Sequence, residues 1–486
     1  MRNAGSCRLA LAVLALLLSD CAVNPVTGRQ DLVTMSEEQE IATGRSEDAN
    51  VRKEYGVYAA PELQKYVDEI GQKLARASHR PNLQYHFTVV DSPEINAFAL
   101  PGGYVYVTRG ILAYMNSEAE LAGVIGHEIG HVTARHSVQQ MSAATAAGLG
   151  ARLLQIFVPA TRNQIGDNAV NVLGNALLSG YGREHELEAD RLGAEYLART
   201  GYEPQAMIKV IGVLKNQELF DAEIAKQEGR EPQSYHGLSA LFASHPEADA
   251  RLKQVIGEAA KYQQAGHAEN QEAFLRRLDR TVYGDSAEQG FARQGTFYHP
   301  GLGLVLSFPP KWKIGNQPDK VAALAPDKEA IIDLRAAGPA KGSPEDVLRK
   351  ALRLSGDSAV QATQINGLQA ASASTSMQGR PTRATAVFLG DKAYLIGAQA
   401  KSTAAMNDYS GAIDATTASF RAMSESERVQ VQPLTLRVIT VAPGLTYAEL
   451  ARRSPLGRNA EGYLRVINGQ YPTGEPSPGQ PLKVVE

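Results

Sequence analysis

The sequence predicts a multidomain α+β protein, and three observations support this prediction. The chain has 486 residues, and at roughly 150 residues per domain this length predicts about three domains. Helical periodicity dominates residues 56–270, whereas alternating strand patterns dominate residues 295–425. A content of 43% hydrophobic and 21% charged residues is typical of a globular chain with ample core.

Residues 1–20 have the pattern of a signal peptide. Arg2 and Arg8 precede the ten-residue apolar run Leu9 to Leu18, which is too short to span a bilayer as a mature helix. The run ends in LLLSDC and resembles a bacterial lipoprotein signal. The resemblance implies that Cys21 carries a lipid and attaches the chain to a membrane. The alternative is a secretory signal with an incidental cysteine.

Cleavage before Cys21 would remove Cys7, the other cysteine, so no disulfide is expected within the mature chain. Ala22 rather than aspartate follows Cys21. In a Gram-negative cell, the resemblance then implies a periplasmic protein anchored in the outer membrane. The formal net charge of −3 provides no basic surface for nucleic acid, which we exclude as a partner.

Residues 21–55 are polar and rich in turn-forming residues, and we expect a tether and N-terminal segment that then packs on the first domain. In the domain of residues 56–270, residues 61–78 predict a helix that starts at Pro61. Its apolar face consists of Leu63, Val67, Ile70 and Leu74.

Two strands and a second helix follow in the same domain. The stretches 83–91 and 102–110 alternate between apolar and polar residues and predict strands. Residues 116–141 predict one long helix, with Asn116 or Ser117 as its N-cap and acidic residues in its first turn.

Residues 137–180 are rich in alanine, glycine and leucine. Arg152, Arg162 and Asp167 interrupt every apolar run before it reaches the roughly 18 residues of a membrane-spanning helix. We therefore expect a helical hairpin or a mobile lid over a cleft, rather than a membrane hairpin.

Residues 295–425 predict a separate α+β domain of unknown role. The segments 302–309, 330–337, 383–390 and 393–400 are expected to be strands, and the segments 343–354 and 409–423 helices. Trp312, the only tryptophan, is expected in its core. No catalytic constellation is found in this domain.

Residues 433–486 predict a third unit with the order strand, helix, helix, strand. With APGLTYAELA, RVING and PGQPLKVV, this βααβ unit resembles the LysM carbohydrate-binding module. The resemblance implies peptidoglycan as a partner. The alternative is a module that serves only as a packing domain.

The motif HEIGH, residues 127–131, carries the candidate chemistry. Residues four apart share one face of a helix, so His127 and His131 can direct ring nitrogens at one Zn²⁺. Glu128 projects about 100° further round the helix, where it can hold a water molecule. Zinc lowers the pKa of that water and polarises a carbonyl, while Glu128 takes the proton and passes it to the leaving amine.

Catalytic zinc commonly keeps three protein ligands and one open position. His136 lies roughly opposite His127 and His131 on the predicted helix, so we exclude it as a ligand and expect a surface or capping histidine. A second helix, residues 180–204, has two carboxylate pairs at a spacing of four residues, namely Glu184 with Glu188 and Glu186 with Asp190. One member of a pair could bind zinc and the other could orient a ligand histidine. The spacing does not choose between the pairs.

The segments HEIGH and REHELEAD resemble the HtpX- and CAAX-prenyl-protease-type zinc metallopeptidase family. The stretches 24–44, 96–112 and 244–251 are similar to segments of its soluble lipoprotein-type members. The resemblance implies a mostly helical zincin-type metallopeptidase domain with a small sheet and one zinc per chain. It also implies Glu186 as the third ligand, and Asp190 as a residue that supports the site or donates a proton.

The stretch NAFALPGGYVYV predicts a turn beside an edge strand. An exposed edge can pair with an extended substrate backbone, so we expect Asn96, Ala97 and Phe98 to bind substrate. The alternative is a plain hairpin. We also expect Arg183 to contact substrate.

The resemblance places the His-Pro segment that contains His245 near the metal. His245 could occupy the open metal position until substrate or the segment 137–180 displaces it. Alternatively, it could stabilise the oxyanion of the reaction. These two roles predict opposite effects of His245→Ala, which are a higher and a lower rate of proteolysis.

The leading hypothesis is a zinc-dependent endopeptidase of the bacterial cell envelope that hydrolyses unfolded or misassembled envelope proteins. One alternative is a peptidoglycan-tethered chaperone or scaffold with a regulated, weakly active zinc site. Another is an enzyme that cuts the cross-links of peptidoglycan.

Overall fold

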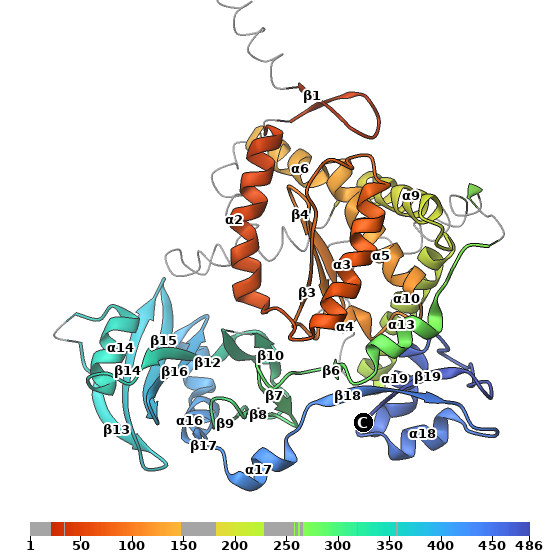
Figure 1. Ribbon diagram of the computed structural model, residues 1–486. Helices are drawn as coiled ribbons and strands as arrows, with labels where there is room; N and C mark the ends of the chain where they lie inside the picture. Colours follow the sequence, from red (N-terminus) through yellow and green to blue (C-terminus); the bar gives the residue numbers. More distant parts are fainter. Residues whose placement is uncertain are drawn as a thin grey trace, which may run out of the picture. The chain divides into compact units, whose positions relative to one another are not determined.

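Figure 1 shows the computed structural model of the chain. It describes residues 21–146 apart from 34, 181–227, 257, 261–262, and 266–486 apart from 318 and 356–357. The predicted signal peptide, most of the predicted lid and His245 lie outside the described residues. No helix within the described ranges is long and apolar enough to cross a membrane.

The chain forms two compact units rather than three. Unit 1 consists of Met1–Tyr283 together with Thr435–Glu486, and unit 2 consists of Gly284–Leu434. The predicted metallopeptidase domain, residues 56–270, and the predicted LysM-like module, residues 433–486, therefore fall together. Unit 2 is an insertion in the sequence of unit 1.

Residues 21–55 begin with a short antiparallel pair, β1 (Cys21–Val23) and β2 (Gln30–Leu32). They end in the helix α2 (Glu37–Tyr55), whose first turn is closed by a reciprocal capping box between Ser36 and Gln39. This helix packs against two strands, β4 (Ala97–Leu100) and β5 (Tyr104–Thr108), of a sheet in unit 1.

One sheet of unit 1 consists of the three strands β3 (His86–Val90), β4 (Ala97–Leu100) and β5 (Tyr104–Thr108). Their order is β3-β5-β4, with β3 parallel and β4 antiparallel to β5. Every residue of the central strand β5 is buried. The helix α3 (Pro61–Arg76) packs on β3 through the apolar face predicted from the sequence.

Helices make up most of the rest of residues 56–283 that the structure describes. They are α4 (Arg109–Leu112), α5 (Glu118–Thr133), α6 (His136–Ala146), α9 (Arg183–Arg199), α10 (Ala206–Gln227) and α13 (Gln271–Leu278). In Figure 1, α5 lies among α3, α9 and α10, and it contacts all three.

The prediction of one long helix over residues 116–141 was wrong. Helix α5 ends at Thr133, and Arg135 has a φ of 59°, in the left-handed region that an α-helix cannot contain. A long-range ion pair holds this residue, because its Nε donates to the Glu40 carboxylate at 3.0 Å. Helix α6 then starts in a new direction at His136.

Helices α5 and α9 approach so closely that their backbones meet. A Cβ atom on Gly130 of α5 would lie 3.0 Å from the carbonyl oxygen of Ala189 in α9. A Cβ on Gly193 of α9 would lie 3.1 Å from the backbone nitrogen of His127. Because these glycines carry no side chain, α9 can lie directly beside the HEIGH motif.

The C-terminal segment has the predicted order β18 (Leu434–Thr440), α18 (Tyr447–Arg453), α19 (Ala460–Ile467) and β19 (Pro481–Val485), with a 3₁₀ turn at Gly457–Asn459. Its two strands are antiparallel, and β6 (Val282–Tyr283) extends them into a three-stranded sheet.

This segment packs directly on the helices of unit 1. Helix α19 contacts α10, where the ring of Tyr463 meets the ring of Phe220 edge to face at 4.9 Å. The buried Lys483 ammonium donates to the carbonyl oxygens of Ala113 and Met115 at 2.7 and 2.6 Å. The C-terminal segment therefore completes the core of unit 1.

Unit 2 has the predicted α+β composition. Its larger sheet has seven strands in the order β10-β11-β12-β16-β15-β14-β13, all neighbours antiparallel. The strands are β10 (Lys313–Gln317), β11 (Lys320–Leu324), β12 (Ala330–Pro339), β13 (Gln361–Ile365), β14 (Leu368–Met377), β15 (Arg380–Leu389) and β16 (Lys392–Ala400).

A smaller sheet and four helices complete unit 2. The sheet has the order β17-β9-β8-β7. Its strands are β7 (Phe291–Arg293), β8 (Thr296–His299), β9 (Leu304–Ser307) and β17 (Arg421–Ala422), and the helices are α14 (Pro344–Leu352), α15 (Thr403–Asp408), α16 (Ser410–Ala418) and α17 (Glu425–Gln430). The predicted strands and helices of this region are therefore present. Trp312 packs against the core of unit 2, as expected.

Candidate metal centre

Three buried side chains converge where α5 and α9 cross. His127 and His131 come from α5, and Glu186 comes from α9. The two Nε2 atoms lie 3.0 Å apart, and the Glu186 carboxylate lies 3.6 Å from His127 Nε2 and 3.4 Å from His131 Nε2. No other group of three or more potential ligands is found among the described residues.

The spacing of these atoms fits a zinc-sized ion. Tetrahedral zinc with bonds of about 2.0–2.2 Å places neighbouring ligand atoms roughly 3.3 Å apart. The three observed separations bracket this value. Burial lowers the pKa of His131, which favours the neutral imidazole that a metal ligand must be. Two histidines and one carboxylate leave one position open for a reactant.

The two carboxylate pairs of α9 have different neighbours. Asp190 Oδ1 lies 2.9 Å from His127 Nδ1, on the side of the ring away from Glu186. Glu188 does not face the three ligands, and its carboxylate instead lies 3.3 Å from His136 Nε2. The structure thus places Glu186 and Asp190, rather than Glu184 and Glu188, against the HEIGH histidines.

Glu128 is almost fully buried, with 2% of its surface exposed, and follows His127 on α5. Tyr181 borders the same site, since its ring stacks on His131 at a centroid distance of 3.9 Å. The Tyr181 hydroxyl lies 2.6 Å from Ser137 Oγ. Burial raises the pKa of Tyr181, so its hydroxyl is neutral. Tyr181 could not be predicted as a site residue, because a lone tyrosine after a glycine has no distinguishing pattern.

His136 is not among the three ligands, but its predicted position was wrong. It is fully buried, and its Nδ1 lies 2.9 Å from Nδ1 of His131. The turn at Arg135 brings it to the side of His131 that faces away from Glu186. No residue type in the sequence marks this turn, because Arg135 is neither glycine nor asparagine.

The predicted substrate-binding residues lie at the sheet edge and at a helix start. Ala97 and Phe98 belong to β4, which is an edge strand of the three-stranded sheet, and Asn96 precedes it. Phe98 packs between the rings of Tyr55 and Tyr106. Arg183 is the exposed first residue of α9.

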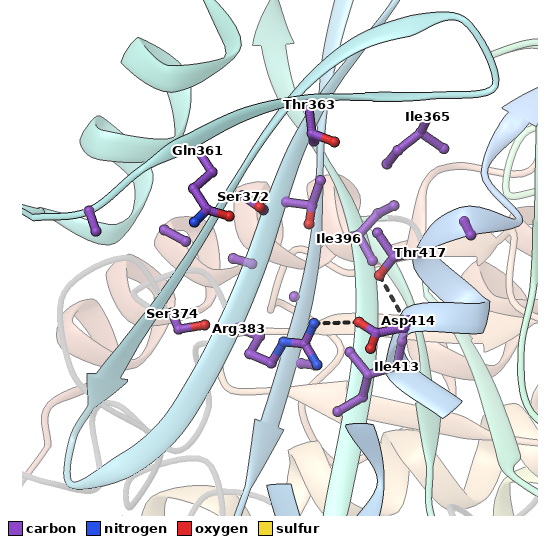
Figure 2. Close-up of a pocket in the computed structure, with 17 residues that line it drawn as sticks. Gln361, Thr363, Ile365, Ser372, Ser374, Arg383, Ile396, Ile413, Asp414 and Thr417 are labelled. Atoms are coloured by element: carbon purple, nitrogen blue, oxygen red, sulfur yellow. Dashed lines mark hydrogen bonds and ion pairs between the residues drawn. The ribbon is translucent and has the colours of Figure 1, made fainter. Parts of the chain in front are cut away.

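A cavity of about 420 Å³ lies in unit 2, between strands β13–β16 and helix α16 (Figure 2). Its polar lining includes Gln361, Thr363, Ser372 and Ser374, and Arg383 forms an ion pair with Asp414 beside them. The lining contains no histidine or cysteine. With Asp414 as its one carboxylate, the lining offers no set of metal ligands.

Comparison with known proteins identifies the region around the metal centre. Residues 61–259 match the family model described as peptidase family M48. A putative β-barrel assembly-enhancing protease of Vibrio cholerae is 35% identical over 184 residues, which cover 36% of this chain and 37% of that protein. The β-barrel assembly-enhancing protease of Escherichia coli K12 is 30% identical over 226 residues, covering 45% and 43%.

A eukaryotic protein also matches about half of the chain. The mitochondrial metalloendopeptidase OMA1 of Schizosaccharomyces pombe is 28% identical over 235 residues, covering 48% of this chain and 64% of that protein. The chain spans less than half the length of the bacterial relatives named above. These matches confirm the resemblance seen in the segments HEIGH and REHELEAD. Residues 61–259, which hold the three converging ligands, are therefore a peptidase family M48 domain.

Proposed function

We propose that the chain is a zinc-dependent endopeptidase of the bacterial cell envelope. The observation that carries this proposal is the buried triad of His127, His131 and Glu186, with donor atoms 3.0 to 3.6 Å apart, inside a peptidase family M48 domain. Two imidazoles and one carboxylate are a donor set typical of peptidase zinc.

The side chains around the triad have separate roles in peptide hydrolysis. When bound, the metal lowers the pKa of a water molecule and polarises the carbonyl of the scissile bond. Glu128 accepts the proton of the attacking water and delivers it to the leaving amine nitrogen. The Asp190 carboxylate, 2.9 Å from His127 Nδ1, orients the ring of His127, and the ring of Tyr181 stacks on His131 beside the triad.

The substrate is an extended polypeptide chain. Strand β4 can pair with main-chain groups and therefore accept many sequences, with Asn96, Ala97, Phe98 and Arg183 as contacts. Unfolded or misassembled envelope proteins have such extended segments, and the names of the bacterial relatives refer to β-barrel assembly. His245 acts at the metal in one of its two roles, blocking the open position or stabilising the oxyanion.

The location of the enzyme is inferred from Cys21 and from the C-terminal segment, residues 433–486. A lipid on Cys21 would anchor it in the outer membrane with the peptidase in the periplasm. The C-terminal segment, residues 433–486, would bind peptidoglycan as a LysM-like module. The packing of this segment on α10 shows that it also has a structural role in unit 1.

The test is Glu128→Gln in the purified full-length chain. The amide is nearly isosteric but cannot accept the proton, so we expect unchanged zinc content and at least a ~100-fold loss of casein hydrolysis. Glu186→Ala should instead lose the zinc. Wild-type turnover of Glu128→Gln would contradict the proposed role of Glu128. A zinc-loaded wild-type chain that prevents aggregation but does not cleave casein would favour the chaperone alternative.

A further inference from the structure

We propose that His136 and Glu188 are positioning residues for the metal centre, which orient the ligand His131 through a chain of hydrogen bonds. This inference rests on the proposed zinc-dependent function and extends it to two residues outside the ligand set. It starts from the contact between His136 Nδ1 and His131 Nδ1 at 2.9 Å, and from that between His136 Nε2 and Glu188 Oε2 at 3.3 Å.

The proton positions along this chain follow from the geometry. His131 must present an unprotonated Nε2 to the metal, so its proton is on Nδ1. That N–H donates to Nδ1 of His136, which must therefore accept. The proton of His136 is then on Nε2 and donates to the Glu188 carboxylate. One arrangement of protons on two neutral imidazoles satisfies every contact, with the negative charge of Glu188 at its outer end.

Several contacts hold the ring of His136 in place. The ring is fully buried and stacks on His185 at a centroid distance of 4.2 Å with an interplanar angle of 18°. His185 and Glu188 are three residues apart and share one face of α9. Arg191 Nη2, 3.4 Å from Glu188 Oε1, supports that carboxylate in turn.

The two ligand histidines then have equivalent support from α9. His127 Nδ1 meets the Asp190 carboxylate directly, whereas His131 Nδ1 reaches the Glu188 carboxylate through His136. A carboxylate behind a ligand histidine fixes the ring orientation and raises its basicity, typically with a 10- to 100-fold effect on metal affinity. An apolar residue would fill the space of His136 but could not accept the His131 N–H.

The experiment compares four variants of the purified full-length chain. His136→Leu removes both hydrogen bonds, whereas His136→Asn keeps an acceptor oxygen near the position of Nδ1. Glu188→Gln removes the charge, and Glu184→Gln, on an exposed residue of the same helix, is the matched control. Zinc affinity is measured by competition with a chromophoric chelator, and the ligand field by visible absorption of the Co²⁺-loaded chain.

We expect about 10- to 100-fold weaker zinc binding and a shifted Co²⁺ spectrum for His136→Leu. His136→Asn should recover most of the affinity, Glu188→Gln should bind about 10-fold more weakly, and Glu184→Gln should equal the wild type. If His136→Leu does not fold, the comparison of zinc affinity between Glu188→Gln and Glu184→Gln tests the inference. Glu188→Gln should fold, because the Glu188 side chain is partly exposed and glutamine keeps its shape.

Two results would overturn the inference. One is a wild-type zinc affinity and Co²⁺ spectrum in both His136→Leu and Glu188→Gln. The other is an equal loss in His136→Leu and His136→Asn, which would mark His136 as a packing residue. Failure of the proposed function is a different outcome, in which the wild type binds no zinc or Glu186→Ala keeps it.

Discussion

Glu40 is a buried carboxylate that stabilises the C-terminal end of helix α5. Only 1% of its surface is exposed, and it accepts hydrogen bonds from Arg80 at 2.8 Å and from Arg135 at 3.0 Å. Arg80 also donates to the carbonyl oxygen of Val132, in the last turn of α5. Glu40 thus stabilises both the end of α5 and the left-handed conformation of Arg135 that directs His136 toward His131.

Glu40→Ala should destabilise unit 1 by about 3–5 kcal/mol, because it removes the buried carboxylate that the guanidinium groups of Arg80 and Arg135 share. Denaturant unfolding of the full-length chain measures the change. Glu62→Ala is the control, since the Glu62 side chain is 84% exposed and its ion pair with Arg277 spans 3.8 Å. Equal free energies of unfolding for the two variants would refute a structural role for Glu40.

His299 in unit 2 should make this unit sensitive to acid. Its burial, assisted by the charge of Lys392, lowers the pKa of His299 to about 4, and its Nδ1 accepts the Leu302 N–H at 3.3 Å. The unfolded chain has a histidine pKa near 6.5. Above pH 6.5 His299 is neutral in both the folded and the unfolded state, and unit 2 has its full free energy of unfolding. As the pH falls from 6.5 toward 4, the unfolded state binds the proton first, so the free energy of unfolding decreases by at most about 3 kcal/mol.

Fluorescence of Trp312, the only tryptophan, reports the unfolding of unit 2 in the full-length chain. The difference in free energy of unfolding between wild type and His299→Gln should narrow between pH 6.5 and 4, because the variant cannot take up the proton. Parallel curves over this range would show that His299 is not the group responsible.

Single residues differ in how much the sequence could reveal about them. The four-residue spacing places His127 and His131 on one face of any helix, so their convergence was predictable. Glu186 could be chosen over Glu184 only through a family resemblance, because the choice depends on how α9 crosses α5. His136 could not be placed, since its position depends on a contact between Arg135 and Glu40, which are distant in sequence.

At the scale of elements, the close crossing of α5 and α9 sets the geometry of the metal centre. The donor atoms of Glu186 can reach both histidines only if the helix backbones approach at Gly126, Gly130 and Gly193. Periodicity predicted α3, β3 and β5, because each has an apolar pattern of its own. It did not predict the crossing, because small residues show where helices can meet but not which helix they meet.

Gly130→Ala should therefore weaken both the fold and the metal site. Its Cβ would lie 3.0 Å from the Ala189 carbonyl oxygen and 3.1 Å from Ala189 Cα, so α9 must move away. We expect a loss of about 1–3 kcal/mol in the free energy of unfolding and weaker zinc binding. Gly212→Ala in α10, where a Cβ meets no atom within 4 Å, should be neutral or stabilising. Unchanged zinc affinity in Gly130→Ala would contradict this account of the crossing.

At the scale of the whole molecule, unit 2 is an insertion whose two ends are held together. Thr281 and Leu436, on either side of it, are joined by a backbone hydrogen bond of 2.8 Å. The helix and strand patterns predicted the elements of both units. They did not predict that residues 433–486 would belong with the peptidase, because that depends on a contact between β19 and a loop about 370 residues earlier.

Replacement of residues 284–434 by a short flexible linker should leave unit 1 folded, because its core is built from the two flanking segments. The shortened chain should show a cooperative unfolding transition and bind one zinc. A matched deletion of residues 435–486 should destabilise unit 1, since it uncovers Phe220 and leaves the carbonyls of Ala113 and Met115 without Lys483. An unfolded shortened chain would contradict the insertion model.

This arrangement also determines when unit 1 can complete its core during synthesis of the chain. A ribosome synthesises the chain from its N-terminal side, so the proposed ligands His127, His131 and Glu186 emerge long before β18 and β19. The carbonyl groups of Ala113 and Met115 have no hydrogen bond from Lys483 until all of unit 2 has been synthesised. The peptidase core is complete only when the last strand has arrived. The proposed hydrolase would thus mature late, only after unit 2 has been synthesised.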